Sequence, residues 1–269
     1  MNRFIKKSVS CLLSLVMVFG LLATGMLVPT ADAEIDICGY SPAMSMSELL
    51  ESGNDSVIGE TYSIASAFEL RDFATFVNNG GSTYGVTFYL SKDIDLADIE
   101  WVPIGSTALH SFAGTFDGCG FAVLNLTAEN AGNYFGLFGF TTVGAVIRNL
   151  GVNGSINGGT NVGGIVACLN NGTVENCWNA VDVKGVSNVG GIVGIASSGT
   201  VENCCNYGYI TGSDTVGALA GALVTNSHIY HSYYVYYSAD AACGKKDETS
   251  SSYVFRFASS STEVLTEKE

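Results

Sequence analysis

Positively charged residues are scarce in this sequence. Lysine and arginine together number 11, against 25 aspartates and glutamates, which gives a formal net charge of −14. A surface of that sign repels nucleic acid and anionic membranes, so neither is expected as a partner. Most of the charge lies toward the two ends of the chain, and the middle contains few ionisable groups. This distribution is typical of soluble ends around a neutral stack of repeats.

Known catalytic motifs are also missing. The chain has three histidines and no His-Glu-x-x-His pattern, no Gly-x-Ser-x-Gly elbow and no phosphate-binding loop. His228 and His231 are three residues apart, which on a regular strand places them on opposite faces. Arg148 and Lys184 stand alone in the sequence, so the proton-abstracting groups of a polysaccharide lyase are difficult to assemble. We therefore expect no catalytic residue and no cofactor.

Long apolar runs are confined to the N-terminus. Three basic residues precede an apolar run from Cys11 to Val28, and Ala31-Asp32-Ala33 fits a small-x-small cleavage site. Residues 1–33 are predicted to be a signal peptide cleaved after Ala33, and an uncleaved membrane anchor is the alternative. Cleavage leaves 8 basic residues against 24 acidic ones. Because no second span and no surface-sorting motif follow, we expect a secreted or cell-surface-associated protein without membrane insertion.

The middle of the chain is a repeat. Asn161–Val166, with the sequence Asn-Val-Gly-Gly-Ile-Val, returns 27 residues later at 188–193, and in altered form after another 27 at 215–220. A looser copy occupies 133–138, and a second phrase, Val-Glu-Asn-Cys, keeps the same step at 174–177 and 201–204. A fixed period of this length indicates stacked units, none of which can bury its apolar face without its neighbours.

The composition of each unit favours strands. Short runs of β-forming residues are broken by Gly, Asn, Ser and Asp, and no window has the spacing of an amphipathic helix. The predicted fold is all-β, a right-handed parallel β-helix (β-solenoid) with 27-residue coils stacked at about 4.8 Å and an N-terminal capping helix. Two inward ladders are expected, one of Val162, Val189 and Val216 and the other of Ile165, Ile192 and Leu219.

Asparagines recur with the same period. Asn149, Asn176 and Asn203 are separated by steps of 27, and Asn125 precedes them by 24. Stacked in register, their side-chain amides are expected to hydrogen-bond along the stack. A ligand-binding role is the alternative, although a binding site rarely recurs on every coil.

These repeats carry a family resemblance. They resemble the GLUG-type repeat of bacterial secreted and cell-surface proteins, through the sequence Val-Gly-Gly-Ile-Val-Gly followed by Gly-Thr-Val-Glu-Asn-Cys. The GLUG-type repeat also occurs beside the catalytic domain of immunoglobulin-A-cleaving zinc metalloproteases. The resemblance covers about residues 61–234, including Ile64–Leu70, Lys92–Leu96, Trp101–Gly105 and Phe112–Gly118. It implies an extracellular β-helix scaffold and leaves the ligand open. The zinc motif of the metalloprotease relatives is missing here.

The capping helix is predicted between residues 63 and 78. Ser63 or Ser66 can cap its N-terminus, Glu69 fits a capping box with Ser66, and Asn78–Gly81 ends it. Its apolar positions are Leu70, Phe73, Ala74 and Val77. A single amphipathic helix ahead of a solenoid is expected to cover the open end of the core and the first unpaired strand edge.

The chain is accordingly divided into five segments. Residues 1–33 are the signal peptide, 34–60 a flexible leader, 61–132 the cap helix and irregular first coils, 133–238 the repeats, and 239–269 a polar tail.

Several acids invite a calcium site. Asp93, Asp95 and Asp98 have a suggestive spacing, and Glu100 and Asp117 follow, but the Gly and the distal Glu of an EF-hand loop are missing. A solvated acidic face is favoured, and no metal ligand is assigned.

Seven cysteines remain after cleavage, so at least one must be a free thiol. Cys177 and Cys204 share one repeat position and should lie one strand spacing apart, within disulfide range. Buried thiols that act as small apolar groups are favoured over a disulfide framework or a metal site.

The last coil ends in an aromatic-rich segment. Tyr233, Tyr234, Tyr236 and Tyr237 are candidate binding residues, because aromatic rows can stack against sugar rings. The alternative is that these rings cover the final coil. The function expected is a non-catalytic exported scaffold that presents a binding or adhesion face to a host or cell-wall glycan or protein. A polysaccharide lyase or other carbohydrate-active enzyme on the same solenoid is the alternative.

Overall fold

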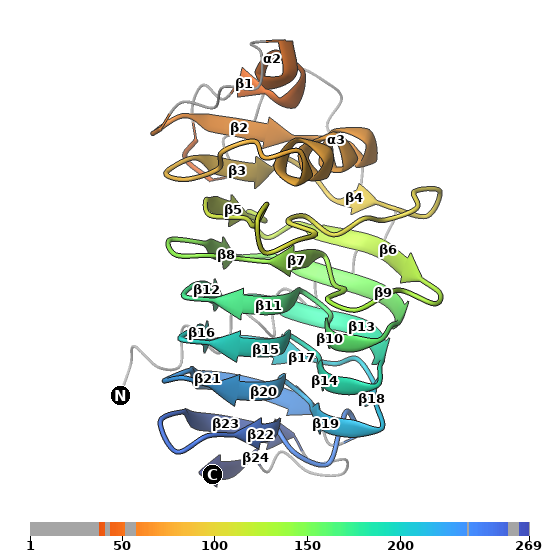
Figure 1. Cartoon of the computed structure of the whole chain (residues 1–269), viewed down its shortest axis with the longest axis vertical. Coiled ribbons are helices and arrows are strands. Elements are labelled where there is room, and N and C mark those ends of the chain that lie inside the picture. The colour runs from red at the N-terminus through yellow and green to blue at the C-terminus, as the bar shows by residue number, and fades with distance from the viewer. Residues whose placement is uncertain (1–37, 41–43, 52–57, 236, 258–263, 269) are drawn as a thin grey trace, which may run out of the picture.

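In the computed structural model, the chain forms a parallel β-solenoid whose strands stack in register along one axis (Figure 1). The structure describes residues 38–40, 44–51, 58–235, 237–257 and 264–268. The predicted signal peptide and its cleavage site lie outside these residues. The described helices, α2 (Met46–Glu51) and α3 (Ala67–Asn78), are too short to cross a membrane.

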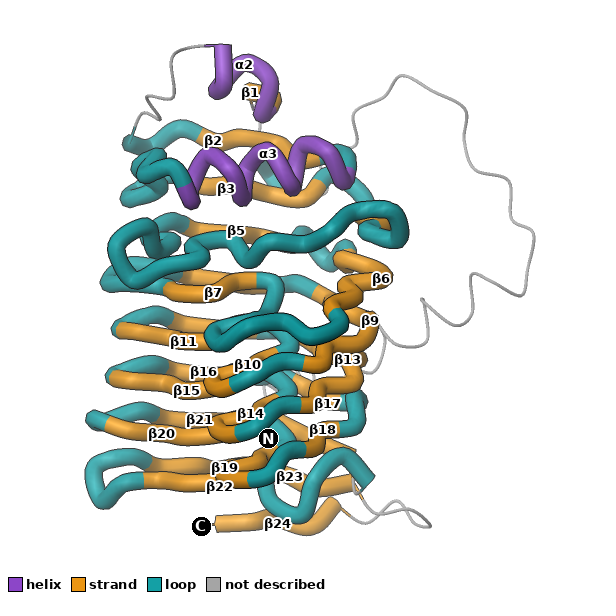
Figure 2. The backbone as a smooth tube through the Cα atoms, turned by 45° about the vertical axis from the view of Figure 1, so that its right-hand side comes forward, coloured by secondary structure: helices purple, strands orange, loops and turns teal. Residues whose placement is uncertain are grey.

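Four ladders of strands run along the stack, and Figure 2 shows the coils as successive rungs. The first ladder contains β1 (Met44–Ser45), β2 (Thr61–Ile64), β3 (Thr87–Leu90), β5 (Thr115–Asp117), β8 (Val146–Arg148), β12 (Thr173–Glu175), β16 (Thr200–Glu202), β21 (His228–Val235) and β23 (Ser251–Phe257). The second contains β4 (Ile94–Asp95), β6 (Ala122–Ala128), β9 (Gly151–Asn157), β13 (Trp178–Lys184), β17 (Cys205–Asn206) and β18 (Ile210–Thr211). The long β21 joins these two ladders, because it pairs with both β16 and β17.

The other two ladders complete each coil. The third contains β10 (Thr160–Gly163), β14 (Ser187–Gly190) and β19 (Asp214–Gly217). The fourth contains β7 (Phe138–Phe140), β11 (Val166–Asn170), β15 (Val193–Ser197), β20 (Ala220–Val224) and β22 (Cys243–Lys246). All pairings in these ladders are parallel, and β24 (Val264–Lys268) adds one antiparallel strand beside β23.

The predicted valine ladder is confirmed. Val162 pairs with Val189, which pairs with Val216. The second ladder of the prediction is also present: the backbone N–H of Ile165 donates to Ile192, and that of Ile192 donates to Leu219. Side chains of both sets join one continuous core, in which equivalent residues lie directly above one another.

The first glycine of the Gly-Gly pair in the repeats has a steric cause. A Cβ on Gly163 would lie 2.1 Å from the carbonyl oxygen of Val166, and a Cβ on Gly190 would lie 2.0 Å from that of Val193. Atoms at such distances overlap, so only glycine fits where the backbone turns tightly between the third and fourth ladders.

The repeated asparagines have a different role from the one expected. Asn149, Asn176 and Asn203 have φ values of 52°, 54° and 52°, in the left-handed region that asparagine tolerates better than most residues. The side-chain amide of Asn149 donates to the Asp117 carboxylate, and that of Asn203 donates to the Glu202 carboxylate. Neither donates to the asparagine of the neighbouring coil. The period therefore reflects a sharp corner in every coil, and the predicted amide ladder at these positions is wrong.

Amide stacking occurs elsewhere in the solenoid. Inside the core, the amide of fully buried Asn179 donates to Asn206 at 2.7 Å, and Asn206 donates in turn to Ser238. A second pair joins Asn188 to Asn161 at 2.7 Å. Each buried amide thus finds its partner one coil away, which avoids the cost of an unpaired polar group in the core.

The predicted helix is present as α3, which lies alongside β2 and β3 near the N-terminal end of the stack (Figure 2). It does not cover the first strand edge, because β1 pairs with β2 and α2 lies beyond it (Figure 1). Ser66 is its N-cap and accepts a bond from the Glu69 N–H, while the Glu69 carboxylate accepts one from the Ala65 N–H. The ring of Phe73 lies 4.3 Å from that of Phe88 and close to two further core phenylalanines. The apolar face of the helix therefore packs onto the core of the N-terminal coils.

Two segments are more ordered than the sequence indicated. The presumed leader contains β1 and α2, and α2 buries Met46 and Leu49 completely. The presumed polar tail contains β22 and β23, which extend the fourth and first ladders by one more coil. Both were missed because neither keeps the 27-residue step; Tyr230 pairs with Tyr253 after only 23 residues.

Candidate functional site

One outward-facing row of side chains runs along the first ladder, with one residue from each strand. In β12 and β16 the middle residues, Val174 and Val201, are buried, while the flanking residues point outward. The row that follows these inward positions consists of Tyr89, Asp117, Arg148, Glu175, Glu202, Tyr230 and Tyr253, each in register with the next. It is polar and charged toward the N-terminus and aromatic toward the C-terminus.

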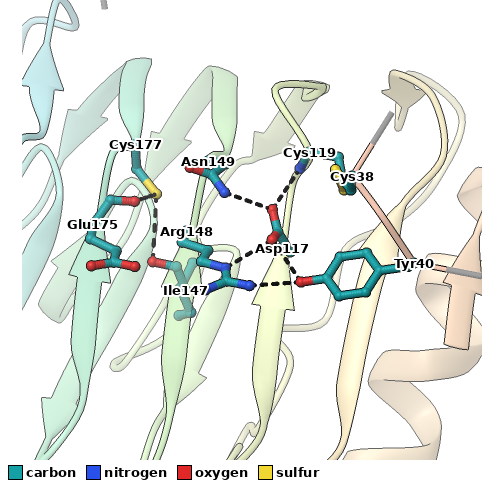
Figure 3. Close-up of polar contacts among 9 residues, drawn as sticks. All are labelled: Cys38, Tyr40, Asp117, Cys119, Ile147, Arg148, Asn149, Glu175 and Cys177. Carbon is teal, nitrogen blue, oxygen red and sulfur yellow. Dashed lines mark hydrogen bonds and ion pairs between the residues drawn. A yellow bond between two sulfur atoms is a disulfide. The ribbon is translucent and has the colours of Figure 1, made fainter. Parts of the chain in front are cut away.

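The N-terminal part of the row is a clamp around Asp117 (Figure 3). The Asp117 carboxylate is almost fully buried and accepts bonds from the Tyr40 hydroxyl at 2.9 Å and from Arg148 Nε at 2.8 Å. The Asn149 amide and the Cys119 N–H each add a bond of 2.9 Å. Arg148 also donates to the Tyr40 hydroxyl at 2.7 Å. Arg148 is therefore not isolated, contrary to the sequence-based expectation.

The clamp is suited to holding structure in place. Partial burial raises the pKa of Tyr40, and the bond to Asp117 raises it further. Burial works to lower the pKa of Arg148, but the bonds to Tyr40 and Asp117 outweigh it, and the net shift is upward. Tyr40 thus stays protonated and Arg148 stays charged near neutral pH. Neither group is prepared to remove a proton from a substrate.

Next to this clamp, a disulfide joins Cys38 to Cys119, with a Cα–Cα distance of 5.8 Å. For these two cysteines, the pairing corrects the expectation that buried thiols are favoured over disulfides. It was not visible in the sequence, because Cys38 lies outside the repeats. The other described cysteines are not joined in disulfides: Cys168, Cys177, Cys204, Cys205 and Cys243. Burial, followed by the contact with Cys177, raises the pKa of Cys204 well above its ordinary value, which fits an apolar, unreactive thiol.

The disulfide allows a first prediction. Replacing Cys38 and Cys119 together by serine should lower the free energy of unfolding by about 2–4 kcal/mol, because the bond closes a long loop in the unfolded chain. Urea unfolding followed by circular dichroism measures the change. As a matched control, Cys168→Ser removes a free, partly exposed thiol and should cost less than about 1 kcal/mol. Equal losses of unfolding free energy in the two variants would contradict the assignment of a disulfide between Cys38 and Cys119.

The C-terminal part of the row belongs to a cluster of six rings. We call it the aromatic cluster: His228, Tyr230, His231, Tyr233, Tyr253 and Phe255. Ring centroids lie 5.4 Å apart for His228 and Tyr230, 6.1 Å for His231 and Tyr253, and 5.0 Å for Tyr233 and Phe255. The ring centroids of Tyr253 and Phe255 are 5.5 Å apart, and this contact connects the rings around His231 with the ring of Tyr233. The cluster covers the outer side of β21 and β23, and Tyr253 is 40% exposed.

A bulge in β21 places both histidines beside the ring of Tyr230. The pairing register shifts between Tyr230 and Ser232, and His231 takes the left-handed corner position that Asn203 holds one coil earlier. His228 and His231 therefore both reach the aromatic cluster, and the prediction of opposite faces is wrong. His231 Nδ1 lies 3.8 Å from a carboxylate oxygen of Glu202, so the cluster adjoins the acidic part of the row.

The tyrosines proposed from the sequence are divided by the structure. Tyr233 belongs to the aromatic cluster, whereas Tyr234 is fully buried and cannot offer its ring to a ligand. Tyr237 is 50% exposed beyond the end of β21, and Tyr236 lies outside the described residues. The sequence analysis missed Tyr253 and Phe255, because they lie in the presumed tail. Their one signal was the consecutive β-forming residues Tyr253, Val254 and Phe255.

The acids near β4 are engaged in local hydrogen bonds. Asp93 accepts a bond from the Ala122 N–H, and Asp95 accepts bonds from the Ala97 N–H and the Asn125 amide. These bonds lower the pKa of Asp95, with the Asn125 bond contributing most. Asp93 and Asp95 thus stabilise turns between successive coils.

Comparison with known proteins gives one result. Neither the family models nor the curated protein sequences contain a match to this chain. Among solved structures, it is similar to a "putative immunoglobulin A1 protease" from Bacteroides ovatus, with 20% sequence identity and a TM-score of 0.57. The two share a fold. The match covers 75% of this chain and 66% of that chain, so the chain spans just under two thirds of its neighbour.

The resemblance to repeats that occur beside zinc metalloproteases raises the question of a metal site. Within the described residues, one group of three potential ligands gathers within 4.8 Å: Cys38, Asp117 and Cys119. Two of its members are joined in the disulfide, and the third is bound to Arg148. These groups do not fit a catalytic zinc, which requires free ligands and an open position.

Proposed function

We propose that this chain is an exported, non-catalytic solenoid scaffold of the GLUG type, whose first ladder binds an extracellular glycan or protein. The observation that carries the proposal is the aromatic cluster. Six rings gather on the outer side of two coils whose inward residues already complete the core. Aromatic rings at a surface are a common feature of binding sites, because they bury a large area at a small cost in side-chain entropy.

Two further features support the proposal. The basic and apolar N-terminal segment has the composition of a signal peptide, and an extracellular location suits a chain with a disulfide. The repeat pattern and the shared solenoid fold agree with a scaffold used by secreted and surface proteins. The proposal that the scaffold is non-catalytic rests on the clamp, where Asp117, Tyr40 and Arg148 use their polar groups in hydrogen bonds to one another.

The binding face can be tested directly. A screen of the protein against mucin glycans, cell-wall polysaccharides and extracellular proteins should find a ligand, and Tyr230→Ala with Tyr253→Ala should weaken its binding by about tenfold or more. Surface plasmon resonance measures both affinities. Tyr253→Ala alone, at a half-exposed position, guards against a folding defect in the double variant.

The matched control removes two exposed tyrosines from other parts of the surface. Tyr84 and Tyr209 are 59% and 55% exposed, and replacing both by alanine should leave binding unchanged. Equal weakening by the two double variants would refute the assignment of the face. Turnover of an acidic polysaccharide by the unmodified protein would instead favour the lyase alternative.

A further inference from the structure

Charge along the outward row is unevenly compensated. At one end, the charge of Arg148 is neutralised by Asp117, toward which its side chain turns and away from Glu175 (Figure 3). Among the described residues, Glu175 makes no ion pair, and Glu202 has a single one with His231 at 3.8 Å. Two carboxylates with little compensation therefore stand between the clamp and the aromatic cluster.

These two carboxylates oppose each other across neighbouring strands. Glu175 and Glu202 are register partners in β12 and β16, at the spacing of about 4.8 Å that separates adjacent strands. Like charges in directly opposed positions destabilise a sheet. Neither residue is needed for the core, since both point outward. A cation placed between them would remove the repulsion.

The aromatic cluster directly follows the two glutamates along the outward row. Glu202 is the register partner of Tyr230, and Tyr230 is the partner of Tyr253. The Tyr253 ring is turned by 81° from that of Phe255 and is 40% exposed, so it is accessible to a ligand. Tyrosine rings attract ammonium and guanidinium groups through their π-electrons. Two carboxylates followed by exposed rings thus offer both kinds of contact that a lysine or arginine side chain uses.

We propose that this face binds a lysine- or arginine-rich segment of an extracellular protein, with Glu175 and Glu202 pairing its charges and Tyr230 and Tyr253 packing against its side chains. The inference rests on the proposed function and narrows its ligand class. Electrostatics favours it over a glycan: the chain has a net charge of −14, which attracts cations and repels acidic polysaccharides, while a neutral sugar gains no Coulombic attraction from two negative charges.

The test uses three probes with the whole protein: a lysine-rich peptide, the same peptide with glutamine in place of lysine, and a neutral glucose oligosaccharide. Fluorescence anisotropy at low and high salt measures each affinity. We expect the lysine peptide alone to bind, with affinity falling as salt screens the charges. Glu175→Gln with Glu202→Gln should weaken it about tenfold, the sum of two partly exposed ion pairs.

A control variant distinguishes binding at this specific face from a general attraction to the negative charge of the whole protein. Asp98→Asn with Glu100→Gln removes the same two charges from an exposed loop outside the first ladder, and should change the affinity less than about twofold. Equal weakening by both pairs of substitutions would overturn the proposal.

The remaining outcomes distinguish this inference from the function on which it rests. If the neutral oligosaccharide binds and depends on Tyr230 and Tyr253 but not on the two glutamates, the cationic partner is wrong and the binding face stands. If the binding of neither the peptide nor any ligand found in the screen responds to loss of the rings, both proposals fail.

Discussion

Replacing Gly190 by alanine is expected to lower the free energy of unfolding by about 4 kcal/mol, among the largest effects of any single methyl group in this chain. The new Cβ would lie 2.0 Å from the carbonyl oxygen of Val193 and 2.7 Å from the N–H nitrogen of Gly221 in the next coil. Both are backbone atoms held by the ladders, so the coil spacing itself must change. Urea unfolding followed by circular dichroism measures the loss.

Gly132 provides the matched control. A Cβ at this position meets nothing within 4 Å, and its backbone does not require glycine. Gly132→Ala should therefore be neutral or stabilise the protein by up to about 1 kcal/mol, because alanine reduces the freedom of the unfolded chain. If Gly190→Ala were as well tolerated as Gly132→Ala, the close backbone approach at Gly190, between the third and fourth ladders, would be refuted.

A second large effect is expected at the capping helix. Phe73→Ala should cost about 4 kcal/mol, since the ring is fully buried among Phe88, Phe112 and Phe116 and its loss leaves a cavity. The loss should begin at the N-terminal coil, because the helix covers that end of the core. Hydrogen exchange of the amides in β2 and β3 should accelerate more than that in β15.

The same helix contains the control for this prediction. Phe68 is 61% exposed, and its ring contacts the Arg71 guanidinium at 5.1 Å. Phe68→Ala removes an identical side chain at the cost of one exposed cation–π contact, so it should destabilise by less than about 1 kcal/mol. Similar losses at Phe68 and Phe73 would show that α3 does not cover the core.

The solenoid separates stability from recognition. Inward residues of each strand, such as Val174 and Val201, build the core, while the outward residues Glu175 and Glu202 contribute nothing to it. Substitutions at Glu175 and Glu202 can therefore alter binding while the fold is preserved. That separation is what makes the proposed face testable by mutation, and it suits a scaffold that displays side chains at regular intervals.

Much of the fold could be predicted from the repeat. Val162, Val189 and Val216 align because a constant step of 27 residues places them on successive rungs, and the helical spacing around Phe73 identified α3. The site was harder to predict. Tyr233 was identified, but Tyr253 was not, because the step between the last two coils is shorter and the pattern of the repeat is lost.

The asparagines show why a correct pattern can have an incorrect explanation. A period of 27 is compatible both with stacked amides and with a repeated left-handed corner, and the residue type is the same in both. Only the backbone conformation at Asn149, Asn176 and Asn203 distinguishes them. The amide contact inside the core, between Asn179 and Asn206, lies at a position that the sequence did not single out.

By itself, the sequence determined the coil period, the inward ladders, the capping helix and the negative charge, because each depends on residues near one another in the chain or on a regular step. Tertiary structure decided the disulfide of Cys38 and Cys119, the clamp around Asp117 and the aromatic cluster. These features join segments outside the period to the stack. Their positions depend on how the whole chain packs, and no local pattern encodes that.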